Sequence, residues 1–193
     1  VGVVTFKIAD IADGLVVRYR VPFTQRHLRT HPDSLHTGAE AAYFLGGGHA
    51  VRRQVFLDCG GYPADFFYGA EEQYFTMRLL ESGWSIHYLP EVYVEHYPPD
   101  VDPHSITRKN TYYYHNIRNR IVTACTFLPL RYCVSHVLIW SGLMLYFSLR
   151  HGGTRRTLRG IYDGLRALRF VRRTVIKRTT LEYLRRNHGR LLY

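Results

Sequence analysis

Two adjacent carboxylates, Glu71 and Glu72, stand where the hydrophobic pattern predicts the start of a helix. The exposed amide groups of a first helical turn favour negative charge, so the pair can simply complement the helix dipole. It can also do chemistry, because a carboxylate beside another is harder to ionise and a raised pKa suits a general base. Tyr68 ends an aromatic run before the pair and offers a surface on which a sugar ring could stack. Arg78 follows on the same helix.

Weaker chemical signals lie on either side of this pair. His96 ends a strand of alternating apolar residues, where an imidazole is either a structural group or a metal ligand or phosphate donor. Gly46, Gly47 and Gly48 lack the spacing of known nucleotide-binding loops. They indicate either a plain turn or a backbone that lets a sugar approach closely.

The elements that must position these residues follow from hydrophobic periodicity. Strands are predicted over residues 1–8, 14–20, 41–48, 84–89 and 92–96, the last two being separated by Pro90. Helices are predicted over residues 51–58 and 70–82, and the polar segment 21–40 reads as a loop. The chain up to residue 99 is therefore expected to be α/β.

The character of the chain changes after Pro98 and Pro99, which mark the predicted boundary between a domain of residues 1–99 and a helical tail of residues 100–193. Residues 1–102 carry 8 Lys and Arg against 13 Asp and Glu, whereas residues 103–193 carry 18 against 2. A tail of this charge could meet nucleic acid, anionic lipid or water.

The tail also contains an apolar stretch. Residues 132–149 lack Asp, Glu, Lys and Arg, which leaves open a membrane span, a helix lying in the membrane interface, or an ordinary core helix. Between residues 158 and 171, apolar residues recur at helical spacing among arginines. This basic amphipathic pattern favours an anionic leaflet, and its plain alternative is a solvated charged face.

The ends and the cysteines give further expectations. The chain opens on an apolar run without an initiator Met or a signal peptide, so we expect residues to precede Val1 in the natural protein. Its three cysteines, Cys59, Cys125 and Cys133, match no metal spacing. They are expected to be reduced, in a cytosolic compartment.

Taken in order, these motifs resemble the second half of the catalytic domain of the family-2 inverting glycosyltransferases with the GT-A fold, especially the rhamnosyltransferase-like bacterial members. The resemblance covers about residues 1–120 and is specific only in its sum. The motifs that carry it are Gly46-Gly47-Gly48, Arg52-Arg53, Val55-Phe56, Gly60-Gly61-Tyr62, Phe66-Phe67, Glu71-Glu72, Arg78, Gly83, Pro90 and His96.

The resemblance implies a partial GT-A fold that lacks its N-terminal nucleotide-binding units and is followed by a helical basic tail. It makes Glu72 the base toward an acceptor hydroxyl, with Glu71 helping to hold the site, and His96 a group near the metal and diphosphate. The three glycines, Tyr68 and Arg78 would lie near the donor sugar and acceptor, and the Arg118-Asn119 pair would follow on the next helix.

The sequence also departs from the family. Glu72 replaces the usual Asp, which lengthens the base by one methylene. No Asp-x-Asp metal motif stands in a suitable place, because Asp100-Val101-Asp102 follows the proline pair and reads as a loop.

The implied activity is inverting transfer of a sugar from a nucleoside diphosphate donor to a glycan or lipid-linked acceptor in bacterial glycan synthesis, with Mg or Mn. The implied location is cytoplasmic, peripheral to the inner face of the plasma membrane. Two alternatives stay open: a non-catalytic truncated remnant, and a basic nucleic-acid-binding protein. No known nucleic-acid-binding signature is found, so no nucleic acid partner is predicted.

Overall fold

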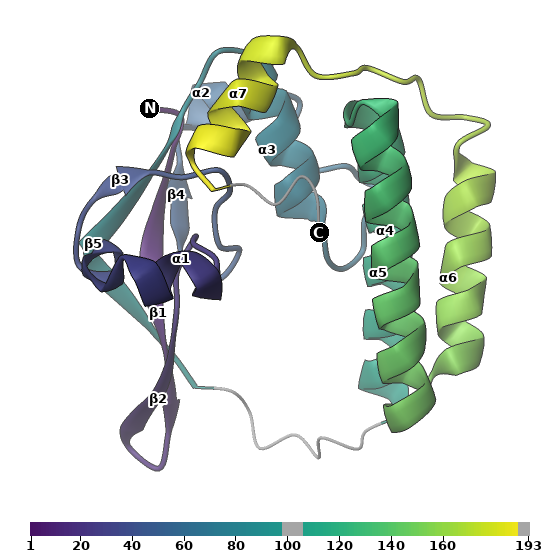
Figure 1. The fold of residues 1–193 in the computed structure, drawn as a ribbon, viewed down its shortest axis with the longest axis horizontal. Helices are drawn as coiled ribbons and strands as arrows, with labels where there is room; N and C mark the ends of the chain where they lie inside the picture. Colours follow the sequence, from purple (N-terminus) through teal and green to yellow (C-terminus); the bar gives the residue numbers. More distant parts are fainter. Residues whose placement is uncertain (98–105, 189–193) are drawn as a thin grey trace. The chain divides into compact units, whose positions relative to one another are not determined.

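The computed structural model describes residues 1–97 and 106–188, and of residues 106–110 it describes the backbone. The predicted domain boundary and the Asp100-Val101-Asp102 segment lie outside these residues. By its contacts the chain divides into two compact units (Figure 1). Unit 1 consists of the described parts of residues 1–61, 75–101 and 177–190, and unit 2 of those of residues 62–74 and 102–176.

Unit 1 contains a mixed sheet of five strands, in the order β2-β1-β5-β3, with β4 pairing separately with β1. The strands are β1 (Val3–Ala12), β2 (Leu15–Arg20), β3 (Ala39–Glu40), β4 (His49–Val51) and β5 (Ile86–His96). β1 and β5 run parallel, whereas β2 and β4 pair with β1, and β3 with β5, in antiparallel orientation. The α/β class predicted from the sequence is confirmed.

Pro90 does not break the last strand as predicted. β5 is continuous, but its register against β1 shifts, so that Leu89 pairs with Phe6 while Tyr93 pairs with Lys7. The residues between Leu89 and Tyr93 therefore bulge from the ladder. Because proline has no N–H to donate, a bulge accommodates it at little cost in hydrogen bonds.

Two other segments differ from the prediction. Segment 21–40 is not all loop, because it forms α1 (Gln25–Thr30) and the 3-10 helix η1 (Pro32–Leu35). α1 has no buried residue to give an apolar stripe. Segment 41–48 is not a strand. Its Ala41, Ala42 and Phe44 lie in irregular backbone and are buried in the core, so burial and not strand formation accounts for the apolar pattern.

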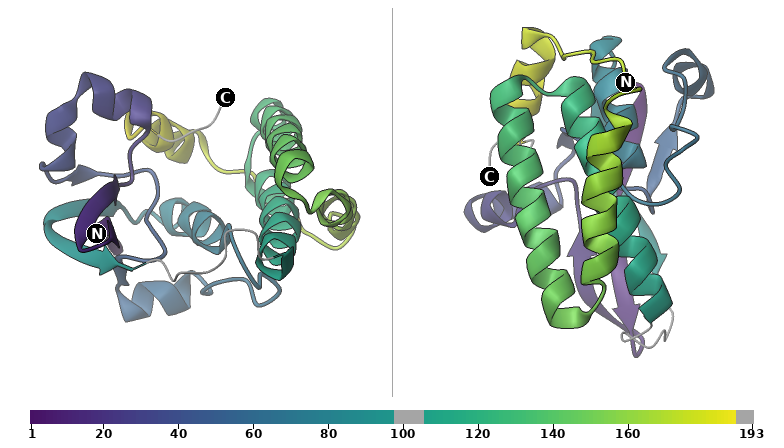
Figure 2. Two further views of the ribbon diagram at one scale, coloured as in Figure 1. Left: turned by 90° about the horizontal axis from the view of Figure 1, so that it is seen from below. Right: turned by 90° about the vertical axis from the view of Figure 1, so that its right-hand side faces the viewer.

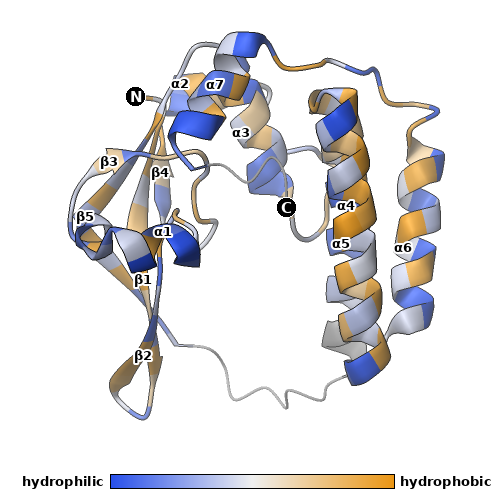
Figure 3. Cartoon of the chain, in the orientation of Figure 1, coloured by the Kyte–Doolittle hydropathy of each residue, from blue (hydrophilic) through white to orange (hydrophobic). Residues whose placement is uncertain are grey.

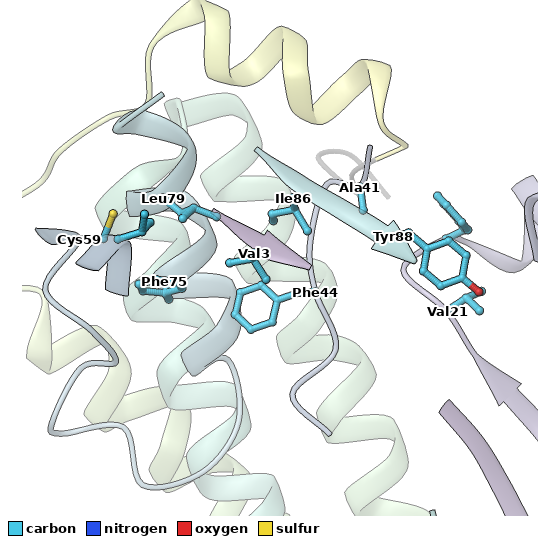
Figure 4. Close-up of a cluster of buried hydrophobic side chains, with 11 residues drawn as sticks. Val3, Val21, Ala41, Phe44, Cys59, Phe75, Leu79, Ile86 and Tyr88 are labelled. Carbon is cyan, nitrogen blue, oxygen red and sulfur yellow. The ribbon is translucent and has the colours of Figure 1, made fainter. Parts of the chain in front are cut away.

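Two helices carry the core of unit 1: α2 (Arg53–Asp58) and α3 (Glu71–Glu81), close to their predicted ranges. Val3 of β1 and Ile86 of β5 share one buried cluster with Phe75 and Leu79 of α3 (Figure 4). All four are fully buried. The inward face of the candidate helix is thus fixed by the sheet.

The last helix, α7 (Arg178–Arg186), also belongs to unit 1. The Tyr183 hydroxyl accepts a hydrogen bond from Ile86 N at 3.2 Å and donates to Ala41 O at 3.2 Å. Lys177 N, just before α7, donates to Glu81 Oε1 at 2.8 Å. The chain therefore returns to the sheet after passing through unit 2.

Unit 2 contains α4 (Ile106–Phe127), α5 (Leu130–His151) and α6 (Thr154–Ala167), which lie alongside one another (Figure 2). Ile117 and Ile121 of α4 are fully buried and share a cluster with Met144 of α5. All three cysteines are free thiols, and the sulfur atoms of Cys125 and Cys133 lie 3.3 Å apart.

Candidate functional site

The acidic pair lies at the first turn of α3, directly after a loop that belongs to unit 2. Gly69 and Ala70 both have left-handed backbone angles, with φ of 79° and 68°, and they turn the chain into the helix. Ala70 O then accepts the first helical hydrogen bond from Tyr74 N, at 3.0 Å. A left-handed alanine costs free energy, so surrounding contacts must hold this turn.

Helix α4 supplies those contacts. Asn119 is fully buried, and its Nδ2 donates to Gly69 O at 2.9 Å and to Tyr68 O at 3.2 Å. Arg118 donates to Asn119 Oδ1 at 2.7 Å and forms an ion pair with Asp65 at 2.6 Å. The Arg-Asn pair noted in the sequence thus clamps the loop that leads to the acidic pair.

The surroundings of Glu72 favour its neutral form. Burial, and next the negative charge of Glu71, raise the pKa of Glu72, while its backbone hydrogen bond and the charge of Arg120 oppose the shift. The pKa of Tyr62 is raised to about 12, first by burial and then by Glu72 and Glu71. Oε2 of Glu71 is buried, and no hydrogen bond to it is found within the described residues. The Glu72 carboxylate is therefore a stronger base than that of an ordinary glutamate.

Arg120 supplies the positive charge that limits the rise in the pKa of Glu72. Its Nε donates to Asn116 Oδ1 at 2.7 Å and its Nη1 to Gln73 Oε1 at 3.2 Å. The guanidinium lies 3.7 Å from the centre of the Trp140 ring. These contacts hold the charge in place, and the sequence pattern did not single out Arg120.

The aromatic run before the pair is divided between two environments. Phe66 is buried, with the Arg118 guanidinium 5.8 Å from its ring centre. Phe67 and Tyr68 are 76% and 45% exposed, so these two, and not Phe66, offer surface to a ring-shaped ligand. Tyr68 also makes an edge contact with Tyr112.

His96 belongs to a second group of polar residues, in unit 1. Asp10 Oδ1 accepts hydrogen bonds from His96 Nδ1 at 2.8 Å and from Arg20 Nη2 at 2.6 Å. The parallel register that pairs Asp10 with His96 brings the two together. Nδ1 therefore carries a proton and Nε2 is left to face a ligand. Sequence reasoning missed Asp10, which follows the strand predicted over residues 1–8 but lies within β1 in the structure.

The glycine run and Arg78, also in unit 1, have structural contacts. Gly48 N donates to Leu45 O at 3.0 Å to close a turn, and a Cβ at Gly48 would lie 3.0 Å from Ile8. The Arg78 guanidinium lies against Gly60, where a Cβ would come within 2.4 Å of it. Packing against Ile8 thus accounts for Gly47 and Gly48. A role for Gly46, Gly47, Gly48 or Arg78 in sugar binding stays a prediction.

The residues around His96 offer few ligands to the expected Mg or Mn. In the described part of the chain, no three His, Cys, Asp or Glu side chains are grouped as a metal site. Asp10 already pairs with Arg20, whose positive charge opposes a cation there. His96 Nε2 could give one ligand, which falls short of the oxygen-rich shell that Mg²⁺ prefers. These residues do not form a metal site by themselves.

Comparison with known proteins adds no assignment. No protein-family model matches the chain, and no curated protein matches it in sequence. The functional inference therefore depends on the order of the motifs and on the geometry of the clamped acidic pair.

Proposed function

We propose that the protein containing this chain is an inverting glycosyltransferase, which moves a sugar from a nucleoside diphosphate donor to a hydroxyl group of a glycan or lipid-linked acceptor. The observation that supports this best is the Glu72 carboxyl group. It stands at the start of α3, beside Glu71, with a pKa raised by burial. It directly follows a loop that Asn119 and Arg118 hold. A fixed carboxylate of increased basicity is what deprotonation of an alcohol requires.

In the proposed reaction Glu72 accepts the proton of the acceptor hydroxyl. The acceptor oxygen forms a bond to the anomeric carbon from the face opposite the nucleoside diphosphate, and the bond from that carbon to the diphosphate oxygen breaks. The configuration inverts, the nucleoside diphosphate leaves with the electron pair, and Glu72 later releases its proton to water. Glu71 keeps the local potential negative, and so keeps Glu72 basic.

The exposed rings of Phe67 and Tyr68 fit the sugar in this proposal, because the C–H face of a pyranose stacks on aromatic side chains. The resemblance assigns His96 to the diphosphate, and this role stays part of the proposal. No metal ligand is assigned there, because Asp10 beside it already pairs with Arg20. A requirement for Mg²⁺ or Mn²⁺ stays a prediction. Nucleotide sugars are cytoplasmic metabolites, so we place the enzyme on the cytoplasmic side of the membrane.

The test uses the gene product that carries this chain. Release of nucleoside diphosphate is measured with UDP-, GDP- and dTDP-sugars, Mg²⁺ or Mn²⁺, and a panel of hydroxyl acceptors, and the anomeric configuration of the product is read by NMR. Glu72→Gln should lower kcat by about 10²–10⁴-fold, the usual contribution of a general base, with donor Kd unchanged. Glu91→Gln, an exposed carboxylate on β5, is the matched control.

Undiminished turnover in Glu72→Gln would remove Glu72 from the mechanism. A folded protein that binds and turns over none of these donors would favour the non-catalytic alternative.

A further inference from the structure

Helix α6 packs on α4 mainly through small residues, and among its large apolar residues the partly buried Ile161 joins the cluster formed with α4 and α5. Thr157, Gly160 and Gly164 form its buried face. A Cβ at Gly160 would lie 2.5 Å from Tyr114 O, and one at Gly164 would lie 3.2 Å from Arg118 O. The two helix backbones are in close contact along this face, so larger side chains cannot occupy it.

As a consequence, α6 exposes a stripe of apolar residues on a face that is not packed on α4. Leu158, Tyr162 and Leu165 recur at helical spacing and are 54%, 62% and 48% exposed. Phe170, which follows the end of α6, is 86% exposed. We call these four residues the α6 stripe. Its contacts within unit 2 leave much of its apolar area to solvent.

The charge beside the stripe is almost all positive. Residues 154–176 contain seven arginines and one acid, Asp163. Asp163 Oδ2 is already engaged, accepting from Arg159 Nε at 3.2 Å and from the Tyr114 hydroxyl at 3.0 Å. Arg155 and Arg166 are exposed on α6 itself. Figure 3 shows that hydrophilic and hydrophobic residues both occur along this helix. A partner that covers the stripe must therefore offer apolar depth and negative charge together.

Helix α5 bears on how a membrane would be met. In the described part of the chain it is the one helix long and apolar enough to cross a bilayer. Yet one face of it is buried, at Tyr132, His136, Met144 and Ser148, and α4, on which it packs, carries the polar clamp. The other face exposes Leu138 and Leu149, at 66% and 70%. This division suits a helix at a surface better than a lone span.

We propose that unit 2 binds the surface of an anionic lipid bilayer through α6, which lies in the plane of the interface. The α6 stripe enters the boundary between headgroups and acyl chains, and Arg155, Arg159 and Arg166 contact lipid phosphates. An amphipathic helix of strong charge and low net hydrophobicity is the type that lies on membranes without spanning them. Nucleic acid would be met by the arginines but would gain nothing from exposed leucines. This proposal does not depend on glycosyl transfer.

The test is vesicle flotation of the full chain at low salt, with phosphatidylcholine vesicles and with vesicles containing one quarter phosphatidylglycerol. The protein should float with the anionic vesicles and stay at the bottom with the neutral ones. Arg155→Gln with Arg166→Gln should weaken partitioning about thirtyfold, since each arginine near an anionic surface contributes about a fivefold factor. Leu158→Gln with Leu165→Gln should reduce flotation to the background level.

The matched control is Leu15→Gln with Val17→Gln on β2, two residues of unit 1 that are 71% and 62% exposed. This variant should float like the unchanged protein, and circular dichroism verifies that every variant keeps its helix content. Equal flotation of the Leu158→Gln, Leu165→Gln variant would overturn the proposal. Resistance of the bound protein to carbonate extraction would overturn it in favour of a span by α5. Stripe-dependent dimers without flotation would overturn it in favour of a second copy.

Discussion

Replacing Asn119 by Ala should loosen the turn that carries the acidic pair. The substitution removes two hydrogen bonds to the carbonyl oxygens of Tyr68 and Gly69 and one from Arg118. An unsatisfied buried polar group costs about 1–3 kcal/mol. Tyr68 is partly exposed, so water can replace part of the loss there. We therefore expect a net cost of about 2–3 kcal/mol, which corresponds to a fall in Tm of about 5–10 °C for a chain of this size.

The assay is thermal unfolding followed by circular dichroism, together with hydrogen exchange of the amides from Asp65 to Tyr74. Those amides should exchange faster in Asn119→Ala at a temperature where the sheet of unit 1 stays protected. Asp65→Ala is the control, because it removes an ion pair of the same loop whose Asp65 side chain is 62% exposed. Because the Asp65 carboxylate is largely in solvent, although Arg118 is 16% exposed, loss of this ion pair should cost about 1 kcal/mol, less than loss of the buried amide. Equal effects of the two variants, or unchanged exchange in Asn119→Ala, would refute the clamp.

Three further predictions concern packing and pH. Gly142→Ala, with open space around the added Cβ, should stabilise α5 by about 0.5–1 kcal/mol. Gly160→Ala should destabilise the protein by about 1–2 kcal/mol, because its Cβ meets the backbone of α4. Urea unfolding measures both changes in the free energy of unfolding, and two changes of the same sign would contradict the close helix contact. The raised pKa of Glu72 means that its ionisation disfavours the folded state, so stability is lost as pH rises through the folded pKa. Glu72→Gln should therefore have a higher Tm than the unchanged protein at pH 7 and an equal Tm near pH 4. A lower Tm of the variant at pH 7 would contradict the burial of this carboxylate. Burial, and next the charges of His188 and His31, lower the pKa of His27 below 6.5. Its contribution to stability is therefore present above pH 6.5 and is lost as pH falls through the folded pKa. His27→Gln should flatten the dependence of Tm on pH between 7.5 and 5, His36→Gln at an exposed histidine is the control, and an unchanged slope in His27→Gln would exclude His27 as the source.

Periodic segments were predictable from the sequence, and segments set by tertiary contacts were not. The spacing of Phe75, Leu79 and Leu80 identified α3 because that helix buries one face. The run from Ala41 to Phe44 was read as a strand because burial in irregular backbone gives the same apolar signal. Pro90 was read as a break because a bulge depends on the partner strand, which local sequence does not specify.

The candidate site divides in the same way. Glu71 and Glu72 could be found because two acids at a helix start form a local pattern. Asp10 and Arg120 could not, because each gains its role from a partner far along the chain: Asp10 from the register with His96, and Arg120 from its contacts with Gln73 and Trp140. Their residue types give no hint of this.

The path of the chain through α7 has a consequence for how the protein is made. The Tyr183 hydroxyl bonds to backbone next to the first strands, and Glu81 caps the entry to α7. A ribosome must therefore release the chain as far as α7 before the sheet acquires these contacts. Until then the helices of unit 2 are an insertion in an unfinished domain. A deletion intended to remove only the basic tail would also take this closing piece from the sheet.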